Sequence, residues 1–278
     1  MRVQVPPYET AHGFAPSVGV AAVQVRRGEG ANIREVVAAE VPVAFAFNGA
    51  DHVVMLATPA DLEDFAAGFC ISEGVVATID EIAALAIHDA GTGLKVALQI
   101  PGARAEALRG RTRHLPGRSG CGLCGISSIE QVLRELPQLP RTPPVGVEAI
   151  MTARDSLADR QLLNQATGAV HGAAFAARDG TILLMREDVG RHNALDKLIG
   201  ALLRGGIDPA SGFAFVTSRC SLEMAQKTIA AGIPLLAAIS APTSLAITLA
   251  KAAGLTLAAF VREAGFNLYT HPDRVILL

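Results

Sequence analysis

Residues 118–125 read Arg-Ser-Gly-Cys-Gly-Leu-Cys-Gly and place Cys121 and Cys124 three positions apart. They are two of only four cysteines in the chain. Glycine permits tight and left-handed backbone, so an exposed turn can present both sulfur atoms. A capping-box pattern over residues 127–131 predicts a helix just after the pair, and the positive end of a helix favours thiolate. The segment is therefore suited to sulfur chemistry or to metal binding.

A single C-x2-C pair is compatible with half a zinc site, a redox dithiol or a sulfur carrier. Zinc needs two further ligands, and the chain has no second C-x2-C pair. We expect Cys70 and Cys220 to be small core residues, and His171 to be a core histidine rather than a ligand. A thioredoxin-like pair usually follows a strand, whereas a basic segment precedes this one. A sulfur carrier, with a reactive cysteine on a glycine-rich arm, fits best, and we expect no bound metal.

Composition excludes several classes of protein. The chain has 278 residues, of which 50% are hydrophobic, and a formal net charge of −2, which argues against a surface that binds nucleic acid. Prolines 234 and 242 interrupt the most apolar stretch, residues 233–250, so we read it as a buried strand and helix, not a membrane span. The first residues contain no continuous apolar run, so we expect no signal peptide, and the few cysteines suggest a reducing cytoplasm.

The N-terminal part is expected to be rich in β-structure. Residues 1–30 have the composition of a flexible tail, and residues 31–118 are expected to form a β-rich lobe. Asn48-Gly49 lies between apolar runs at 41–47 and 53–57, which predicts a hairpin. Thr58 and Pro59 then predict the N-cap and first position of a helix. Further strands are predicted at 82–88 and 94–100.

Residues 104–118 hold five arginines and a histidine against one acid. Glycine and proline near the end of this segment predict irregular backbone. We read it as a mobile basic loop that leads into the cysteine pair. A solvated surface linker is the alternative.

Strands and helices alternate after a proline-rich break at residues 137–144. The predicted strands are 169–176, 181–185, 213–216, 233–239 and 255–261, and the predicted helices are 152–166, 191–203, 221–231 and 243–253. Such alternation predicts an α/β fold with a parallel sheet. Residues 119–278 are expected to form this core.

Ligands of parallel sheets bind where the strands end. The strand ends here are residues 186–193, 217–221, 240–244 and 262–265, and three of them open helices, whose free N–H groups bind phosphate. Arginines 186, 191, 219 and 262 add positive charge. We therefore expect a phosphate-bearing ligand such as a nucleotide, with Arg191, His192 and Ser240 among its contacts. Ordinary helix capping is the alternative.

Several motifs in their order along the chain resemble the formate dehydrogenase accessory sulfurtransferases, also called sulfur carrier proteins of formate dehydrogenase. The similarity runs roughly from residue 41 to the end. It rests on residues 58–64 (Thr-Pro-Ala-Asp-Leu-Glu-Asp), 72–74 (Ser-Glu-Gly), 121–125 (Cys-Gly-Leu-Cys-Gly), 186–197 (Arg-Glu-Asp-Val-Gly-Arg-His-Asn-Ala-Leu-Asp-Lys) and 266–269 (Phe-Asn-Leu-Tyr).

The resemblance implies a cytidine-deaminase-like core and a homodimer. It implies that a cysteine desulfurase passes sulfur to Cys121 as a persulfide, and that this sulfur goes to the molybdenum of a bis-molybdopterin guanine dinucleotide cofactor for formate dehydrogenase. Cys124 would resolve the persulfide or support its transfer. The family's cofactor-binding segment corresponds to Phe260, Val261, Arg262, Glu263, Ala264 and Gly265. Glu263 places an acid where glycine or a basic residue is expected.

Two other functions compete with the sulfur carrier. One is a non-catalytic chaperone that only holds the molybdenum cofactor, and the other is a zinc-stabilised structural protein. Deaminase catalysis needs a His-x-Glu zinc motif. His171-Gly172-Ala173 has alanine in place of the glutamate, so we reject that activity.

Overall fold

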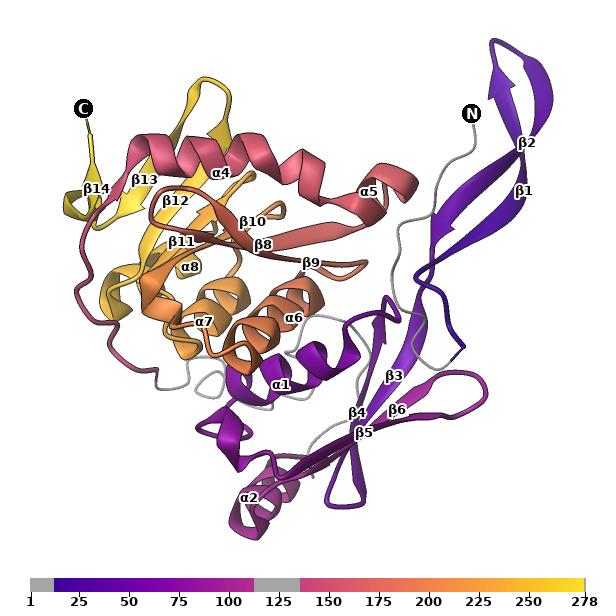
Figure 1. Ribbon diagram of the computed structural model, residues 1–278, viewed down its shortest axis with the longest axis horizontal. Helices are drawn as coiled ribbons and strands as arrows, with labels where there is room; N and C mark the ends of the chain where they lie inside the picture. Colours follow the sequence, from indigo (N-terminus) through magenta and orange to yellow (C-terminus); the bar gives the residue numbers. More distant parts are fainter. Residues whose placement is uncertain (1–12, 113–135, 278) are drawn as a thin grey trace.

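The structure, a computed structural model, describes residues 13–112 and 136–277. A four-stranded sheet, in the order β4-β3-β6-β5, forms the N-terminal lobe (Figure 1). Its strands are β3 (Val41–Phe47), β4 (Ala50–Ala57), β5 (Ala84–Asp89) and β6 (Leu94–Gln99). The predicted hairpin is confirmed: Asn48 and Gly49 both have positive φ, as a two-residue turn between twisted strands requires.

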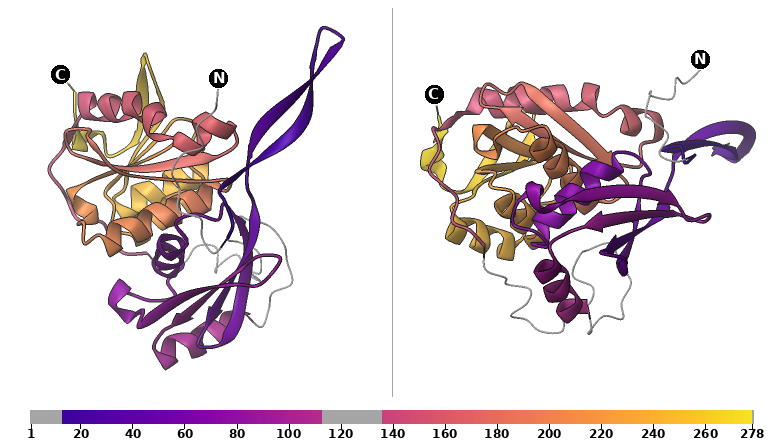
Figure 2. Two further views of the ribbon diagram at one scale, coloured as in Figure 1. Left: turned by 45° about the vertical axis from the view of Figure 1, so that its right-hand side comes forward. Right: turned by 60° about the horizontal axis from the view of Figure 1, so that its bottom comes forward.

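Two long strands precede this lobe. β1 (Ser17–Arg26) and β2 (Glu29–Ala38) form an antiparallel ribbon that reaches away from the rest of the molecule (Figures 1 and 2). The expectation of a flexible tail over residues 1–30 is thus wrong for residues 17–30. Valines recur along β1, and Arg27 and Gly28 both take the positive φ of a hairpin turn. Residues 1–12 lie outside the described part.

The basic segment before the cysteine pair is helical in its first half. Arg104, Arg109 and Arg111 lie in α2 (Gly102–Thr112), so the expected mobile loop is wrong for these residues. Alanine, leucine and arginine are strong helix formers, and their sum outweighs the roughly 1 kcal/mol that Gly110 costs. The remainder of the segment, with Cys121 and Cys124, lies outside the described residues.

A six-stranded sheet in the order β13-β12-β11-β10-β8-β9 forms the second lobe. Its strands are β8 (His171–Ala177), β9 (Ile182–Asp188), β10 (Gly212–Val216), β11 (Leu235–Ala238), β12 (Thr256–Arg262) and β13 (Gly265–Thr270). The sheet is mixed, contrary to our expectation. Within this sheet, only β10, β11 and β12 pair with a neighbour in parallel, because hairpins rather than helices join β8 to β9 and β12 to β13. β9 still points the same way as β10, because β8 is antiparallel to both. The carboxyl ends of β9 to β12 therefore share one edge.

Helices cover both faces of this sheet (Figure 1). One face carries α4 (Val147–Arg160) and α5 (Leu162–Thr167), which replace the single helix expected at 152–166 because the backbone leaves helical geometry at Gln161. The other face carries α6 (Arg191–Arg204), α7 (Leu222–Ala230) and α8 (Ser244–Ala253). Near the C-terminus, β14 (Val275–Ile276) pairs with β7 (Val145–Gly146). Within the described residues, no helix is long and apolar enough to cross a membrane.

The two lobes share one hydrophobic core, which runs from β3 and α1 (Leu62–Ser72) to α6, α7 and α8. α1 and α6 pack at very close range through Gly68 and Gly200. A Cβ atom on Gly68 would overlap the backbone carbonyl of Asp196, and one on Gly200 would overlap that of Asp64. This contact fixes the N-terminal lobe against the core helices. The topology does not test the cytidine-deaminase likeness of the core, which stays a prediction.

Candidate functional site

Hydrogen bonds tie the loops at the common sheet edge to one another. The Cys220 amide donates to Ala241 O over 3.1 Å, and the Thr243 amide donates to Cys220 O over 3.0 Å. The Phe260 amide donates to Ser240 O over 3.2 Å. These bonds thus join the ends of β10, β11 and β12 into one continuous rim, as the strand ends predicted.

Three consecutive residues at the end of β9 make structural contacts with neighbouring helices. Strand residues alternate between faces, so Arg186 and Asp188 point towards α1 while Glu187 points to the opposite side. Arg186 pairs with Asp64 at 2.8 Å. The Glu187 carboxylate accepts the Leu163 and Asn164 amides over 2.8 and 2.9 Å. It thereby satisfies free N–H groups at the start of α5.

Asp188 is fully buried and is the centre of the first interlobe network. Its carboxylate lies 2.8 Å from Lys197 Nζ and accepts the Thr58 amide over 2.9 Å. The same carboxylate accepts the Gly190 amide and the Asn193 side chain over 2.7 and 3.0 Å. Thr58 was expected to cap α1, but that helix begins at Leu62 and Thr58 is buried against Asp188 instead.

A second buried network joins α1, α6 and α7. Lys227 Nζ donates to Asp196 Oδ2 over 2.9 Å, to the Ser72 hydroxyl over 3.0 Å and to Glu73 Oε1 over 2.5 Å. Burial alone would lower the pKa of Lys227, but the Asp196 and Glu73 carboxylates outweigh it and raise that pKa. The motifs at 58–64, 72–74 and 186–197 therefore hold the two lobes together through these contacts.

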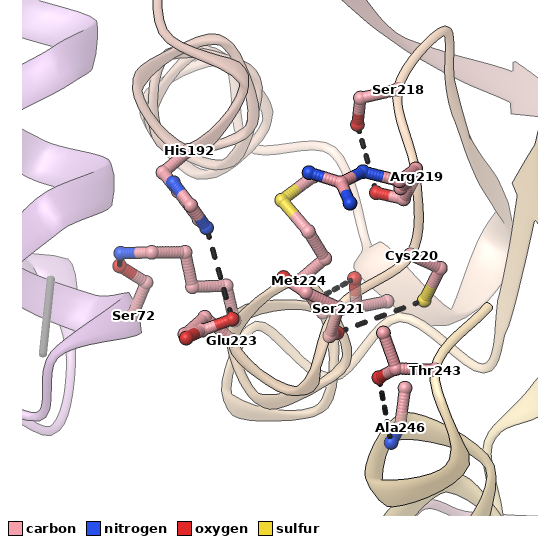
Figure 3. A network of polar contacts seen from close by, with 12 residues as sticks. Ser72, His192, Ser218, Arg219, Cys220, Ser221, Glu223, Met224, Thr243 and Ala246 are labelled. Carbon is pink, nitrogen blue, oxygen red and sulfur yellow. Dashed lines mark hydrogen bonds and ion pairs between the residues drawn. The ribbon is translucent and has the colours of Figure 1, made fainter. Parts of the chain in front are cut away.

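His192 follows the scaffold residues at the N-terminus of α6. Its side chain is buried, and Nε2 lies 3.9 Å from Oε2 of Glu223 at the start of α7 (Figure 3). The imidazole of His192, together with the Ser221 hydroxyl, lowers the pKa of Glu223 to about 2. Sequence reasoning missed Glu223. The sequence feature that could have identified Glu223 is an acidic residue in the first turn of a predicted helix, and this feature is common and not specific to a site.

Positive charge gathers beside His192. Burial lowers the pKa of His171, and the charges of Arg191 and His192 lower it further. His171 thus lies within electrostatic reach of both, at the point where β8 pairs with the end of β9. Arg219 is exposed on the neighbouring loop. The candidates Arg191 and His192, which are consecutive at the start of α6, lie at this edge together with the Glu223 carboxylate.

Residues 260–265 comprise the end of β12, the turn at residues 263–264 and the first residue of β13. Phe260 is partly exposed with φ +54°, a conformation that non-glycine residues rarely adopt, and the Arg262 guanidinium lies 5.8 Å from its ring centre. Val261 points into the core, so its side chain is closed to a ligand. Glu263 pairs with Arg154 of α4 at 3.6 Å. Phe260 and Arg262, next to Ser240, are the side chains that this segment offers, whereas Ala264 and Gly265 offer backbone alone.

Neither cysteine among the described residues offers a reactive thiol at this edge. Cys70 and Cys220 are completely buried, as expected, and burial raises the pKa of each thiol to about 12. Residues 13–112 and 136–277 contain no group of three or more His, Cys, Asp or Glu side chains placed to hold a metal ion.

The fold and the edge define a two-lobed α/β protein with a basic rim along the carboxyl ends of its core strands. Residues 38–276 match the FdhD/NarQ family, and the chain belongs to that family. The resemblance found in the sequence is therefore confirmed. A relative from Xanthomonas euvesicatoria pv. vesicatoria, named sulfur carrier protein FdhD, is 54% identical over 252 residues, which cover 91% of this chain and 90% of the relative.

Two further similarities agree. A protein of the same name from Variovorax paradoxus is 50% identical over 242 residues, which cover 87% of each chain. A crystal structure of a candidate formate dehydrogenase accessory protein from Desulfotalea psychrophila superposes with a TM-score of 0.74 at 26% identity. That match covers 94% of this chain and 100% of the other.

Proposed function

We propose that this protein is a sulfurtransferase that carries sulfur as a persulfide on Cys121. The Cys121 thiolate attacks the terminal sulfur of a cysteine desulfurase persulfide. A new S–S bond forms, the old one breaks, and the desulfurase thiolate leaves. The outer sulfur of the Cys121 persulfide is then transferred to the molybdenum of a bis-molybdopterin guanine dinucleotide cofactor, which this protein would hold as a substrate before the cofactor enters formate dehydrogenase. The persulfide S–S bond breaks, Cys121 leaves as a thiolate, and reduced molybdenum of the substrate would supply the two electrons that convert the sulfane sulfur to sulfide. Relatives named as sulfur carriers support this assignment.

The observation that carries the proposal is the burial of the other two cysteines. A persulfide relay needs an accessible thiolate. Cys70 and Cys220 are buried thiols with a pKa of about 12, so almost none of either is thiolate at neutral pH. This leaves the relay to Cys121 and Cys124, with Cys124 resolving the persulfide or supporting its transfer.

The rim at the sheet edge supports a phosphate-bearing acceptor. The cofactor carries pyrophosphate and guanine groups, which suit arginine and the free N–H groups of helix N-termini. Arg191 and His192 stand at the start of α6, Ser240 follows β11, and Arg262 follows the exposed Phe260 ring. We assign the phosphates to this rim and a guanine base to the Phe260 side of it.

The proposal also covers the partners, the oligomeric state, the cellular location and the fold of the core. Cysteine desulfurase and formate dehydrogenase are the partners, the protein acts as a homodimer in the cytoplasm, and its core is cytidine-deaminase-like. Ala173 occupies the place of the deaminase glutamate. We therefore propose that the inherited fold serves to hold a nucleotide without deaminating it.

A chaperone that holds the cofactor without transferring sulfur is the second candidate, because the basic rim alone would serve it. Formate dehydrogenase activity in cells that carry only a Cys121→Ala variant separates the two. A carrier predicts that this activity is lost while a Cys70→Ala variant, which removes a buried thiol, retains it. Full activity with Cys121→Ala would establish the chaperone instead.

A further inference from the structure

A cavity of about 300 Å³ lies in the N-terminal lobe, between α2 and the hairpin of β3 and β4. Figure 1 shows both elements at the lower end of this lobe. The volume has room for about ten water molecules, or for one small organic molecule. The basic rim belongs to the strands of the second lobe. The cavity is therefore separate from the site proposed for the molybdenum cofactor.

The floor of the cavity is apolar and buried. Phe47 contributes to it from β3, and Ala105 and Leu108 contribute from α2, where residues three apart share one face. These three residues are 3, 4 and 7% exposed. The imidazole of His52 lines one side, at 70° to the Phe47 ring and 5.5 Å from it between centroids. Such a floor favours the hydrocarbon part of a ligand.

The charge that the described residues present at the mouth is positive. Arg109 lines the cavity from α2 and is exposed. Asp51 also lines it, but Asp51 is the cross-strand partner of Ala46, and strand neighbours such as Ala46 and Phe47 point to opposite faces. The Asp51 carboxylate accordingly pairs with Lys95 on the other face of the sheet, over 2.7 Å. A guanidinium at the mouth suits a carboxylate, which it can hold through two parallel hydrogen bonds.

We propose that this cavity binds a small monocarboxylate with an apolar body. The carboxylate pairs with Arg109, and the body displaces water from the floor formed by Phe47 and Leu108. An inorganic anion would leave the floor wet, and an uncharged hydrocarbon would make no use of the guanidinium, so a molecule with both parts fits best. Binding requires neither the cysteine pair nor the rim. The cavity is thus a second site, beyond the sulfur-carrier function.

Hydrocinnamate, a phenyl ring on a short chain that ends in a carboxylate, is the probe. Its amide, hydrocinnamamide, has nearly the same shape without the charge. We expect titration of the full chain, followed by ligand-observed nuclear magnetic resonance, to show binding of the acid. The amide should bind at least about tenfold more weakly, because it lacks the charge-assisted hydrogen bonds.

Two variants locate the binding. Arg109→Ala removes the guanidinium, and should weaken binding of the acid at least about tenfold while leaving binding of the amide unchanged. Ala50→Leu fills the cavity from an exposed position on β4, because Ala50 is the cross-strand partner of Phe47 and shares its face. That variant keeps the guanidinium and should weaken binding of both probes.

Arg104→Ala is the matched control. Arg104 lies on the same helix, but it pairs with Glu81 at 2.8 Å and does not line this cavity. Its removal should leave both affinities unchanged, and an equal loss in Arg104→Ala and Arg109→Ala would trace the effect to α2 as a whole and overturn the proposal. No binding of hydrocinnamate, equal binding of the acid and the amide, or unchanged affinities in Arg109→Ala or Ala50→Leu would overturn it as well. None of these outcomes depends on sulfur transfer.

Discussion

Asp188 and Lys197 form an ion pair of 2.8 Å in which both side chains are completely shielded from solvent. Thr58, 130 residues before Asp188, supplies its amide to the carboxylate and its carbonyl to the Lys197 ammonium, at 2.9 Å each. The Asp188 carboxylate and the Lys197 ammonium thus each have a hydrogen-bond partner in Thr58 besides one another. Such a pair is costly to break, because removal of one charge leaves the other buried alone.

Asp188→Asn should therefore destabilise the protein strongly. We expect the free energy of unfolding, measured by urea denaturation, to fall by about 3–5 kcal/mol. Asp51→Asn is the matched control, because Asp51 forms an ion pair of 2.7 Å with Lys95 on the surface, where its side chain is 74% exposed. That change should cost less than about 1 kcal/mol. Equal losses in the two variants would refute the role assigned to Asp188.

Gly68→Ala should separate α1 from α6. The added methyl group meets a backbone carbonyl, which no change of rotamer can relieve. We expect a loss of at least about 1–3 kcal/mol in thermal or urea unfolding. Gly110→Ala in α2 is the control, because nothing lies within 4 Å of its added methyl group. That variant should gain about 0.5–1 kcal/mol, and a stable Gly68→Ala variant would contradict the close packing.

Glu223 should make stability depend on pH in acid. Its pKa falls from 4.5 to about 2 on folding, chiefly because of His192. A lowered folded-state pKa means that this contribution is complete above about pH 4.5 and is lost as the pH falls through 2. Thermal melts across that range should show a smaller acid decline in Glu223→Gln than in wild type. Glu106→Gln, at an exposed site on α2, should keep the wild-type decline. Superimposable profiles for Glu223→Gln and wild type would exclude the interaction.

Arg262→Ala should weaken nucleotide binding. Guanosine diphosphate, which contains the guanine and pyrophosphate groups of the proposed cofactor, is the probe for calorimetric titration. Loss of a charge-assisted hydrogen bond predicts about tenfold or greater weakening. Arg154→Ala removes the arginine that pairs with Glu263 from α4, and should leave the affinity unchanged. Equal affinities for Arg262→Ala and wild type would remove the β12–β13 hairpin from the binding site.

The sequence predicted those parts of the fold that local signals determine. Asn48-Gly49 marks a hairpin, and the helix predicted over residues 243–253 is α8, with Thr243 as its N-cap. The error at Thr58 has a different origin, because its partner Asp188 lies 130 residues away and no local signal reports it. The mixed sheet escaped prediction for a similar reason. A strand's direction depends on its neighbour in space, and neighbours such as β8 and β10 are separated by a hairpin and a helix.

In the candidate site, too, local signals in the sequence predicted some residues, whereas others depend on contacts between distant parts of the chain. The strand ends made Arg191 and His192 candidates, because helix N-termini and arginine are readable signals in the sequence. Glu223 became visible only when α6 and α7 were placed side by side. The scaffold role of Asp188 was equally hidden, because a motif read in sequence does not separate residues that hold the lobes from residues that meet a ligand.

The most direct test of the sulfur-carrier function is the intact mass of the purified protein after incubation with a cysteine desulfurase and cysteine. We predict a gain of one sulfur atom per chain, which reductant reverses. The gain should be absent in Cys121→Ala and present in Cys220→Ala, which lacks only a buried thiol. A wild-type chain that gains no sulfur, or a Cys121→Ala chain that still gains it, would contradict the account.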